Sequence, residues 1–498
     1  MSPVKDSFRR PFPTPGTVVS AVALAWALFG IHLFHIDGDV GRHIRVGRHI
    51  LSTGEIPRSD IFSHTMLGVP FVPFEWLSEV CFAAADRIAG LTGVAVLSAL
   101  LFAATSLVVY SLVRRLGVGP LLASVAAALS MVLQAVHLLP RPHLFTTLFA
   151  AVFLMLLETY RIRRSVVALG VLIPIMALWT NLHGGFLVGF VLLAVYSLDA
   201  WRPGSAVAAT RIPLVVAAAA CLIASFLNPA GLGVWTHSLS YFGMDFLVDQ
   251  TNEYQSPDFH QLHGKVFLVS ILIGLSLLGS GISRAGFRDL TLFLGWLAAG
   301  LMSARNIPLF GVLAVPWFAP WAKNVLALSR DGPLGPAATR IEEFDSRMEK
   351  VEAQISGFIP AVVLALILIF FAARSGGDRY AFEPESFPVR AVAALDELSL
   401  HGNVFNEMPW GGYLLYTRPD IPVFIDGQTD FYGEDLSRDY LRIRHLSPGG
   451  LDLLDVYEVD WILIPPTVPL SQGLSLDSRW RLEYEDTVAK VYARVFTE

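Results

Sequence analysis

Long apolar runs separated by short polar connections dominate the first three quarters of the chain. Each run has about 17 to 22 residues, the length of a helix that crosses the hydrocarbon core of a bilayer. The pattern predicts a polytopic α-helical membrane protein with about eleven transmembrane helices, at residues 17–36, 92–113, 120–139, 142–160, 165–182, 185–200, 211–228, 265–283, 288–304, 307–322 and 356–373.

Basic residues in the short connections predict the orientation of these helices. Arg114 and Arg115 follow the second run, Arg161 follows the fourth and Lys323 follows the tenth. Cytoplasmic loops carry the excess of Lys and Arg, so the N-terminus is predicted to be cytoplasmic. The first run lacks a small-residue cleavage site, so we interpret it as a retained span.

Three longer stretches then fall on the outer side: the loops 37–91 and 228–264, and the tail from residue 377. Within the first loop, residues 40–51 form an apolar face and an opposite cationic face, typical of a helix lying at the membrane surface. The apolar face holds Val40, Ile44, Gly47 and Leu51, and the cationic face holds Arg42, Arg45 and His49. Residues 75–90 resemble a second such helix, and the charged stretch 330–354 predicts a solvated helix on the inner side.

The tail alternates short β-type runs (403–405, 422–425, 461–464 and 488–495) with helical stretches (389–400, 434–445 and 450–457). Such alternation predicts a small α/β layer. We therefore expect a transmembrane domain at 1–376 and a soluble extracytoplasmic α/β domain at 377–498.

Composition supports the bilayer as solvent and excludes some functions. Of the 498 residues 54% are hydrophobic and 16% charged, with a mean hydropathy of +0.56. The formal net charge is −6 and basic residues are thinly spread, so no nucleic-acid partner is expected. The sequence has no P-loop, no G-x-S-x-G elbow and no H-E-x-x-H motif, which disfavours nucleotide hydrolysis and zinc catalysis.

Candidate chemistry begins with the acidic pair Asp37 and Asp39, directly after the first span. At headgroup depth such a pair can act as a general base or hold a divalent cation against a phosphate. The alternative is that the pair merely caps the following helix. The cationic face beside this pair can bind a lipid phosphate. The alternative is that it attracts anionic lipids without specificity. The face consists of Arg42, Arg45 and His49.

Further polar groups end the apolar runs on the same outer side, where ionisable residues at the membrane edge often mark a site. They are His137, Arg141 and His143; Asn181 and His183; Arg305 and Asn306; and, in the second outer loop, Asp249, Glu253, Tyr254 and Asp258. We predict that carboxylates and cations from these separate loops converge at one lipid-accessible hollow, with Asp37, Asp39 and Glu253 catalytic.

A first span that runs into Asp37-Gly38-Asp39, then a long outer loop and many spans, resembles the GT-C superfamily of integral-membrane glycosyltransferases. The layout looks like the protein mannosyltransferase and aminoarabinose transferase branches. This resemblance implies a polyprenyl-phosphate-linked sugar donor and a first-loop aspartate that serves as base or metal ligand. It suggests Asp39 and Glu253 as ligands of Mg²⁺ or Mn²⁺.

The tail is similar to the extracytoplasmic domain of oligosaccharyltransferase catalytic subunits. The likeness lies in Met408-Pro409-Trp410-Gly411-Gly412-Tyr413, Phe424-Ile425-Asp426-Gly427 and Val459-Asp460-Trp461-Ile462-Leu463-Ile464. It implies a substrate-binding role for Trp410 and Tyr413, although the chain lacks the aspartate of the family's W-W-D-Y-G motif.

Together these features predict a GT-C-type transferase of a bacterial inner membrane that moves a sugar from a lipid-phosphate donor to an extracytoplasmic glycan, lipid or protein acceptor. Arg42, Arg45, Arg141 and Arg305 are the candidates for neutralising the departing phosphate. The alternative is a non-catalytic scaffold or assembly subunit of this fold that binds partner subunits. A third interpretation is a transporter. It is disfavoured because the centres of the spans carry few ionisable residues that could line a substrate path.

Overall fold

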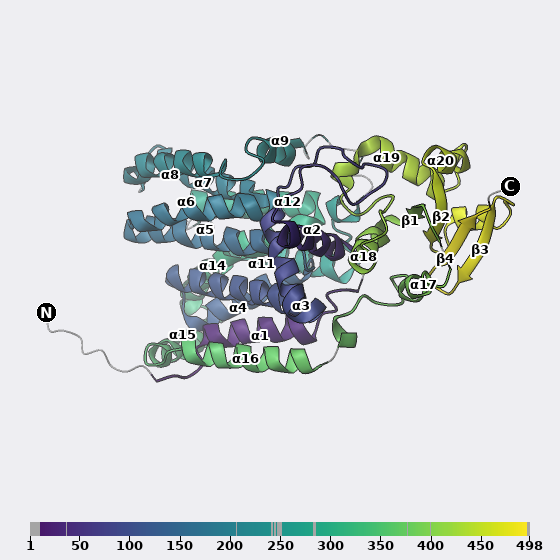
Figure 1. Ribbon diagram of the computed structural model, residues 1–498. Coiled ribbons are helices and arrows are strands. Elements are labelled where there is room, and N and C mark those ends of the chain that lie inside the picture. The colour runs from purple at the N-terminus through teal and green to yellow at the C-terminus, as the bar shows by residue number, and fades with distance from the viewer. Residues whose placement is uncertain are drawn as a thin grey trace.

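The chain has two parts, a large helical bundle and a smaller α/β part formed by the tail (Figure 1). The computed structural model describes residues 10–35, 37–205, 207–240, 243, 246, 251–281, 285–375, 377–398 and 400–495.

The bundle contains the predicted apolar runs, each of which overlaps one of its helices. These helices are α1 (Pro15–Phe29), α3 (Trp76–Arg115), α4 (Pro120–Ala135), α5 (His143–Arg163), α6 (Val166–Leu182), α7 (Leu187–Trp201), α8 (Arg211–Ala224), α11 (Leu262–Gly281), α12 (Phe287–Met302), α13 (Ile307–Leu313), α14 (Phe318–Leu328) and α16 (Phe358–Arg374). Within the described residues, five helical segments are long and apolar enough to cross a membrane. The count of eleven crossings stays a prediction.

Two helices of the first outer loop lie where the pattern placed them. The first is α2 (Asp39–Thr53), and the second is the opening part of α3, which ends at a kink where Ala89 and Gly90 leave the helical conformation. Gly90 has φ 58°, a backbone angle that residues with a side chain rarely adopt. The kink separates the loop helix from the span that follows.

The first half of helix α2 is enclosed on both faces, which differs from a helix whose cationic face is open to water, whereas its last turn is exposed. Val40 and Ile44 are fully buried on the apolar face. Arg42 on the opposite face is also buried, at 5% exposure, because the tail covers it and supplies a carboxylate partner, Asp426.

The tail contains a four-stranded sheet in the order β1-β2-β4-β3, with β1 parallel to β2 and the other pairs antiparallel. Its elements are α17 (Val389–Ala394), β1 (Asn403–Asn406), α18 (Gly411–Thr417), α19 (Thr429–Arg444), α20 (Gly450–Val456), β2 (Val459–Ile464), α21 (Pro469–Leu474), β3 (Trp480–Glu485) and β4 (Lys490–Arg494). The predicted strand at 422–425 is wrong, since only Val423 forms an isolated bridge, with Ser63 of the first outer loop. Strand β3 was not predicted, because Arg481, Glu483 and Glu485 interrupt its apolar pattern.

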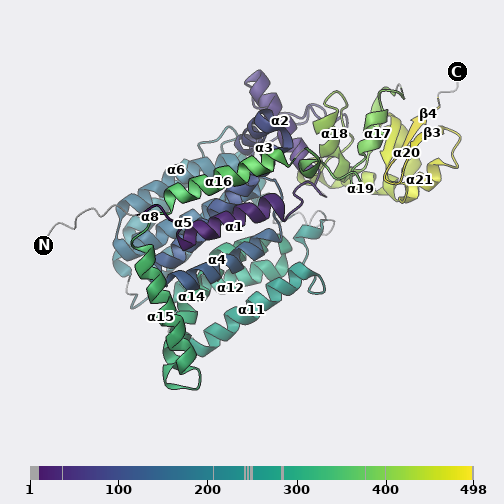
Figure 2. The same ribbon diagram turned by 90° about the horizontal axis from the view of Figure 1, so that it is seen from below.

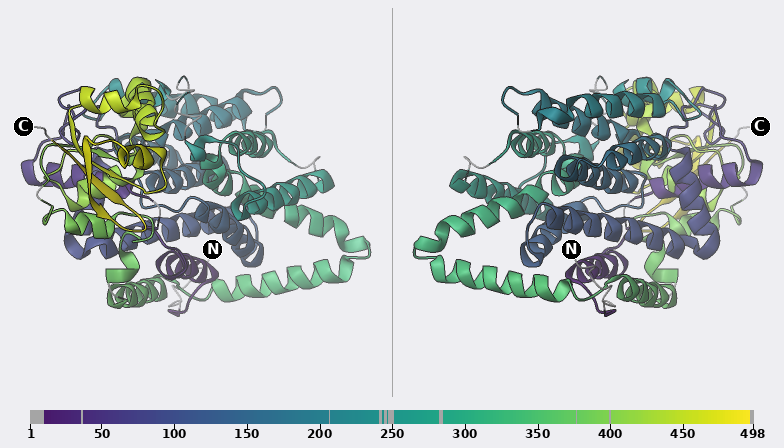
Figure 3. Two further views of the ribbon diagram at one scale, coloured as in Figure 1. Left: turned by 90° about the vertical axis from the view of Figure 1, so that its right-hand side faces the viewer. Right: turned by 90° about the vertical axis from the view of Figure 1, so that its left-hand side faces the viewer.

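The tail docks on the end of the bundle from which α2 emerges, and its sheet stands in front of the bundle in the left view of Figure 3. Helices α18 and α2 cross closely: a Cβ on Gly412 would lie 2.1 Å from the carbonyl oxygen of Gly38, and one on Gly41 would lie 2.1 Å from that of Gly412. The glycines of Trp410-Gly411-Gly412 therefore allow α18 and the start of α2 to pack closely. The charged helix α15 (Gly335–Glu352) lies away from the tail (Figure 2).

Candidate active site

Five charged side chains from separate loops meet at the end of the bundle that faces the tail. Asp37 and Asp39 stand at the start of α2, and Arg141 precedes α5. Glu253 lies in the short 3-10 turn Asn252–Tyr254, and Arg305 lies in the turn Ala304–Asn306. The structure thus brings these carboxylates and cations together at one end of the bundle; we call these five residues the acidic cluster.

Arg141 is the centre of the acidic cluster. Its Nε and Nη2 donate to the two carboxylate oxygens of Asp37, each at 2.6 Å. Nη2 also lies 3.0 Å from Oδ2 of Asp39, and Nη1 lies 3.7 Å from Oε2 of Glu253. One guanidinium therefore contacts three carboxylates.

The two aspartates differ in accessibility. The Asp37 side chain is 1% exposed, and its Oδ1 also accepts the backbone N–H of Asp39 at 3.0 Å, so Asp37 fixes the first turn of α2 as well. The Asp39 side chain keeps 20% of its surface exposed. Of the pair, Asp39 is the one that a ligand can reach.

Glu253 links Arg141 to a second cation. Its Oε1 lies 3.2 Å from Nη1 of Arg305, and its Oε2 lies 3.3 Å from Nε2 of His137. Arg305 also contacts Tyr254 through the phenol oxygen and across the ring face. The Arg305 side chain is 31% exposed, which leaves the guanidinium able to meet an anionic ligand.

Next to the acidic cluster lies a second group of titratable side chains, in which Arg42 and His183 were predicted whereas His43, Glu75 and Glu79 were missed by sequence reasoning. His43 contacts Oε1 of Glu79 at 3.5 Å and Oε2 of Glu75 at 4.0 Å, and the other oxygen of Glu75 lies 3.5 Å from Nε2 of His183. Glu79 also pairs with Arg42 at 3.6 Å. The available signal was the i, i+4 spacing of Glu75 and Glu79, which puts both on one face of the loop helix.

The tail covers Arg42 and Asp39. Asp426 is 1% exposed and lies 3.3 Å from Nε of Arg42. At the next residue, a Cβ on Gly427 would lie 1.8 Å from Oδ1 of Asp39, so only glycine leaves room for that carboxylate. The Phe424-Ile425-Asp426-Gly427 motif of the tail therefore forms one wall of the site.

Two carboxyl groups at the site have raised pKa values. Burial raises the pKa of Asp39 to about 6, against the opposing effect of Arg141 and with the support of Asp37. Burial likewise raises the pKa of Glu75 to about 7, although His43 acts in the opposite direction. Both groups exchange protons near neutral pH, as a general base or acid must.

Other groups at the site are held in one protonation state. Burial opposes ionisation of Glu253, but Arg305 and Arg141 outweigh it and lower its pKa to about 2. Burial lowers the pKa of His137 to about 4 and that of His183 to about 3. At neutral pH Glu253 is therefore an anion and the two histidines are uncharged.

Three further predicted residues lie at or beyond the edge of the acidic cluster. His143 borders it, with its ring 4.7 Å from that of His137 and its Nε2 2.9 Å from the His137 carbonyl oxygen. Arg45 contacts the carbonyl oxygen of Pro419 at 3.5 Å, and the ring of His49 lies 6.3 Å from that of Phe62. Arg45 and His49 contact the tail and the loop rather than the acidic cluster.

Trp410 and Tyr413 are packed inside the junction between bundle and tail. The Trp410 indole donates to the carbonyl oxygen of Ser386 at 2.9 Å, and the Tyr413 ring lies 5.5 Å from that of Phe387. Both are 4% exposed. In this structure they join the two parts of the chain, and their role toward substrate stays a prediction.

In the described part of the second outer loop, Glu253 belongs to the acidic cluster and Tyr254 contacts its Arg305. Asp258 caps the local backbone by accepting the N–H of His260 at 2.8 Å. Asp249 lies outside the described residues. Among those that are described, no group of three or more His, Cys, Asp or Glu side chains is arranged to hold a metal ion.

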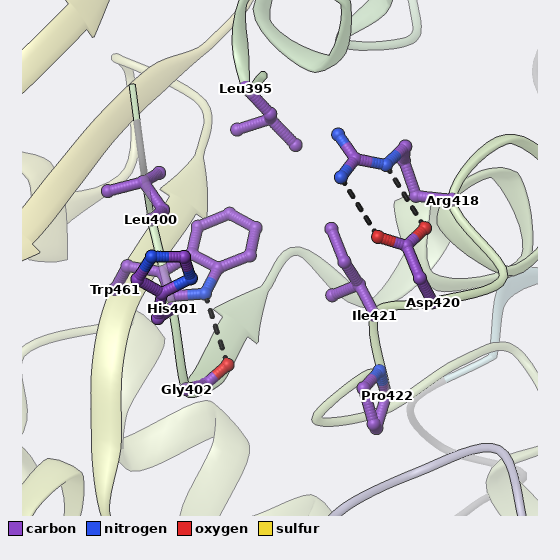
Figure 4. Close-up of a pocket in the computed structure, with 9 residues that line it drawn as sticks. All are labelled: Leu395, Leu400, His401, Gly402, Arg418, Asp420, Ile421, Pro422 and Trp461. Atoms are coloured by element: carbon purple, nitrogen blue, oxygen red, sulfur yellow. Dashed lines mark hydrogen bonds and ion pairs between the residues drawn. The ribbon is translucent and has the colours of Figure 1, made fainter. Parts of the chain in front are cut away.

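Two cavities lie away from the acidic cluster. One of about 200 Å³ is in the tail, beside the ion pair of Arg418 with Asp420 and the buried Trp461 (Figure 4). The other, about 430 Å³, lies at the kink of α3 and is lined by Arg48 and Arg87 among others. None of the five residues of the acidic cluster lines either cavity.

No known family profile matches the sequence, and no curated protein matches it either. Several solved structures do match the fold of this chain.

The structures are of an oligosaccharyltransferase from Archaeoglobus fulgidus, one of them described as the archaeal enzyme AglB with an inhibitory peptide and a dolichol-phosphate. That complex has a TM-score of 0.59 at 12% identity, over 90% of this chain and 68% of the other. The apo form gives 0.58 at 12%, over 96% and 74%, and a complex with zinc and sulfate gives 0.56 at 13%, over 96% and 73%. At these identities the likeness establishes the fold.

Proposed function

We propose that the chain is a membrane glycosyltransferase that moves a sugar from a polyprenyl-phosphate-linked donor to an acceptor outside the cytoplasm. The observation that carries this proposal is the acidic cluster, in which a reachable carboxylate, Asp39, lies 3.0 Å from the partly exposed guanidinium of Arg141, and Glu253 links Arg141 to the partly exposed Arg305. A base next to fixed cations is what sugar transfer from a phosphate ester requires.

Asp39 is the base in this mechanism. It removes the proton from the acceptor hydroxyl as that oxygen bonds to the anomeric carbon of the sugar. The bond between the anomeric carbon and the phosphate oxygen breaks, and the lipid phosphate leaves with the electron pair. Asp37 cannot take this role, because both of its oxygens are held by Arg141 and its side chain is 1% exposed.

The departing lipid phosphate gains negative charge, and Arg305 with Arg141 stabilises it. A preorganised cation outside bulk water stabilises developing charge strongly. Glu253 holds the two guanidinium groups in place, since its oxygens contact one each. The similar archaeal enzyme was solved with a dolichol-phosphate, which supports a lipid-phosphate donor for this fold.

The proposed function also includes a location for the acidic cluster and the tail relative to the membrane. We place the acidic cluster and the tail on the extracytoplasmic face of a bacterial inner membrane, with residues 1–376 as the membrane domain and 377–498 as the outer domain. Support comes from the basic inner loops of the sequence and from the position of α15 away from the tail. The acceptor is a glycan, a lipid or a protein.

The test compares sugar transfer in membranes that contain wild-type, Asp39→Asn or Glu55→Gln protein. Glu55 is an exposed acidic residue of the same outer loop and serves as the matched loss of charge. We expect labelled polyprenyl-phosphate sugar to be consumed by the wild type and by Glu55→Gln, but not by Asp39→Asn. Full transfer by Asp39→Asn would remove the carboxylate mechanism.

A further inference from the structure

The acidic cluster places a guanidinium where three carboxylates converge. Asp37, Asp39 and Glu253 come from two outer loops, and all three contact Arg141, at 2.6, 3.0 and 3.7 Å. Several carboxylates directed at one point are the usual oxygen ligands of a hard divalent cation. Here the positive charge at that point belongs to the protein chain.

The carboxylate oxygens have little capacity left for a metal. Five of the six contact a cationic or imidazole group: both oxygens of Asp37, one of Asp39 and both of Glu253. The sixth, Oδ1 of Asp39, faces the backbone at Gly427. A divalent ion would have to displace a bidentate guanidinium whose aspartate partner is 1% exposed.

The positive charges at the site also disfavour a divalent metal ion. Two guanidinium groups, Arg141 and Arg305, lie on the three carboxylates, so a divalent ion placed among them would sit next to two positive charges. The residues of this site therefore do not fit a divalent metal ion, although a protein of similar fold was solved with zinc.

We propose that Arg141 is a built-in cation that takes the place of a divalent metal, so that the site works without one. The guanidinium holds both carboxylate oxygens of Asp37 and contacts Asp39, while 22% of the Arg141 side chain stays exposed. The catalytic part of this proposal rests on the function proposed above, whereas its metal-binding part does not.

Mn²⁺ binding to the purified full-length chain in lipid nanodiscs tests the proposal, with the free ion followed by electron paramagnetic resonance. We expect no saturable micromolar binding by the wild type, and new saturable binding by Arg141→Ala, which leaves three carboxylates without their shared cation. Arg48→Ala is the matched control, since Arg48, which lies in α2, pairs with one carboxylate, Asp86, at 2.7 Å. It should gain no binding.

Saturable binding of one Mn²⁺ by the wild type that Asp39→Asn abolishes would overturn the proposal. So would the absence of binding in a folded Arg141→Ala protein. If Arg141→Ala does not fold, the wild-type titration still decides, and Arg141→Lys should remain without saturable binding. Where transfer is measurable, EDTA should leave it unchanged; loss restored by Mn²⁺ would contradict the built-in cation. A chain without transferase activity would fail the proposed function but leave the Mn²⁺ result valid.

Discussion

Replacing the two aspartates of the outer loop separately by asparagine should separate stability from catalysis. Asp37 makes two hydrogen bonds of 2.6 Å to Arg141 and is 1% exposed, so Asp37→Asn leaves a largely buried guanidinium short of a partner. Breaking a buried ion pair costs about 3 to 5 kcal/mol, and because Arg141 keeps Asp39 and Glu253 we expect about 2 to 3 kcal/mol here. Asp39→Asn removes one contact of a partly exposed group and should cost about 1 kcal/mol or less.

The rate of sugar transfer should be affected in the opposite order, with the larger loss in Asp39→Asn and the smaller in Asp37→Asn. As the base, Asp39 contributes a factor of about 10² to 10⁴ in rate, which Asp39→Asn should remove. The assay combines equilibrium unfolding in mixed detergent micelles with sugar transfer at a temperature where both variants are folded. An Asp37→Asn protein as stable as the wild type would refute the structural reasoning. An Asp39→Asn protein with the wild-type rate would refute the assignment of the base.

Three other outcomes follow from the structure. The transfer rate should rise as the pH increases through about 6, the pKa of Asp39, because the base must be deprotonated; a profile already flat above pH 4.5 would contradict this. The pKa of Glu75 is raised from 4.5 to about 7 because the folded protein favours the protonated carboxyl group. The stabilisation from this group is therefore present below pH 4.5 and is lost as the pH rises through 7. Glu75→Gln should therefore unfold at a higher temperature than the wild type at pH 8, with a smaller gain at pH 5. Gly412→Ala puts a Cβ 2.1 Å from the backbone oxygen of Gly38, which directly precedes α2, and should cost about 1 to 3 kcal/mol, seen as faster proteolysis between bundle and tail.

Sequence reasoning could place the bundle because each helix carries its own signal. An apolar run of sufficient length is local information, and so is the change of pattern at the kink beside Gly90. Strands of the tail were harder to predict: β1, β2 and β4 have apolar centres, but β3 lies at a sheet edge with Arg481 and Glu485 exposed and Glu483 half-buried. A strand with one open face depends on its partner, which the sequence does not display.

The site was predictable only in part, for the same reason. Four residues stood out because charged groups at the ends of apolar runs are costly, and Glu253 stood out because its loop is predicted to lie on the same side of the membrane. The four are Asp37, Asp39, Arg141 and Arg305. That Arg141 would join three carboxylates depends on how distant loops fold together. The distinction between Asp37 and Asp39 depends on burial that two residues of separation cannot reveal.

The tail motif illustrates a further limit. Trp410 and Tyr413 resemble acceptor-binding residues by order along the chain, yet both side chains are packed in the junction with the bundle. Glycines of the same motif bring α18 onto α2, which positions Gly427 against Asp39. Sequence order alone does not distinguish a residue that contacts substrate from one that docks the domain.

An experimental density map of the chain with a bound polyprenyl phosphate tests the central claim most directly. The account predicts the phosphate within about 3 Å of the guanidinium of Arg305 or Arg141, on the exposed side of Asp39. A phosphate bound instead in the cavity beside Arg48 and Arg87, away from the acidic cluster, would contradict it.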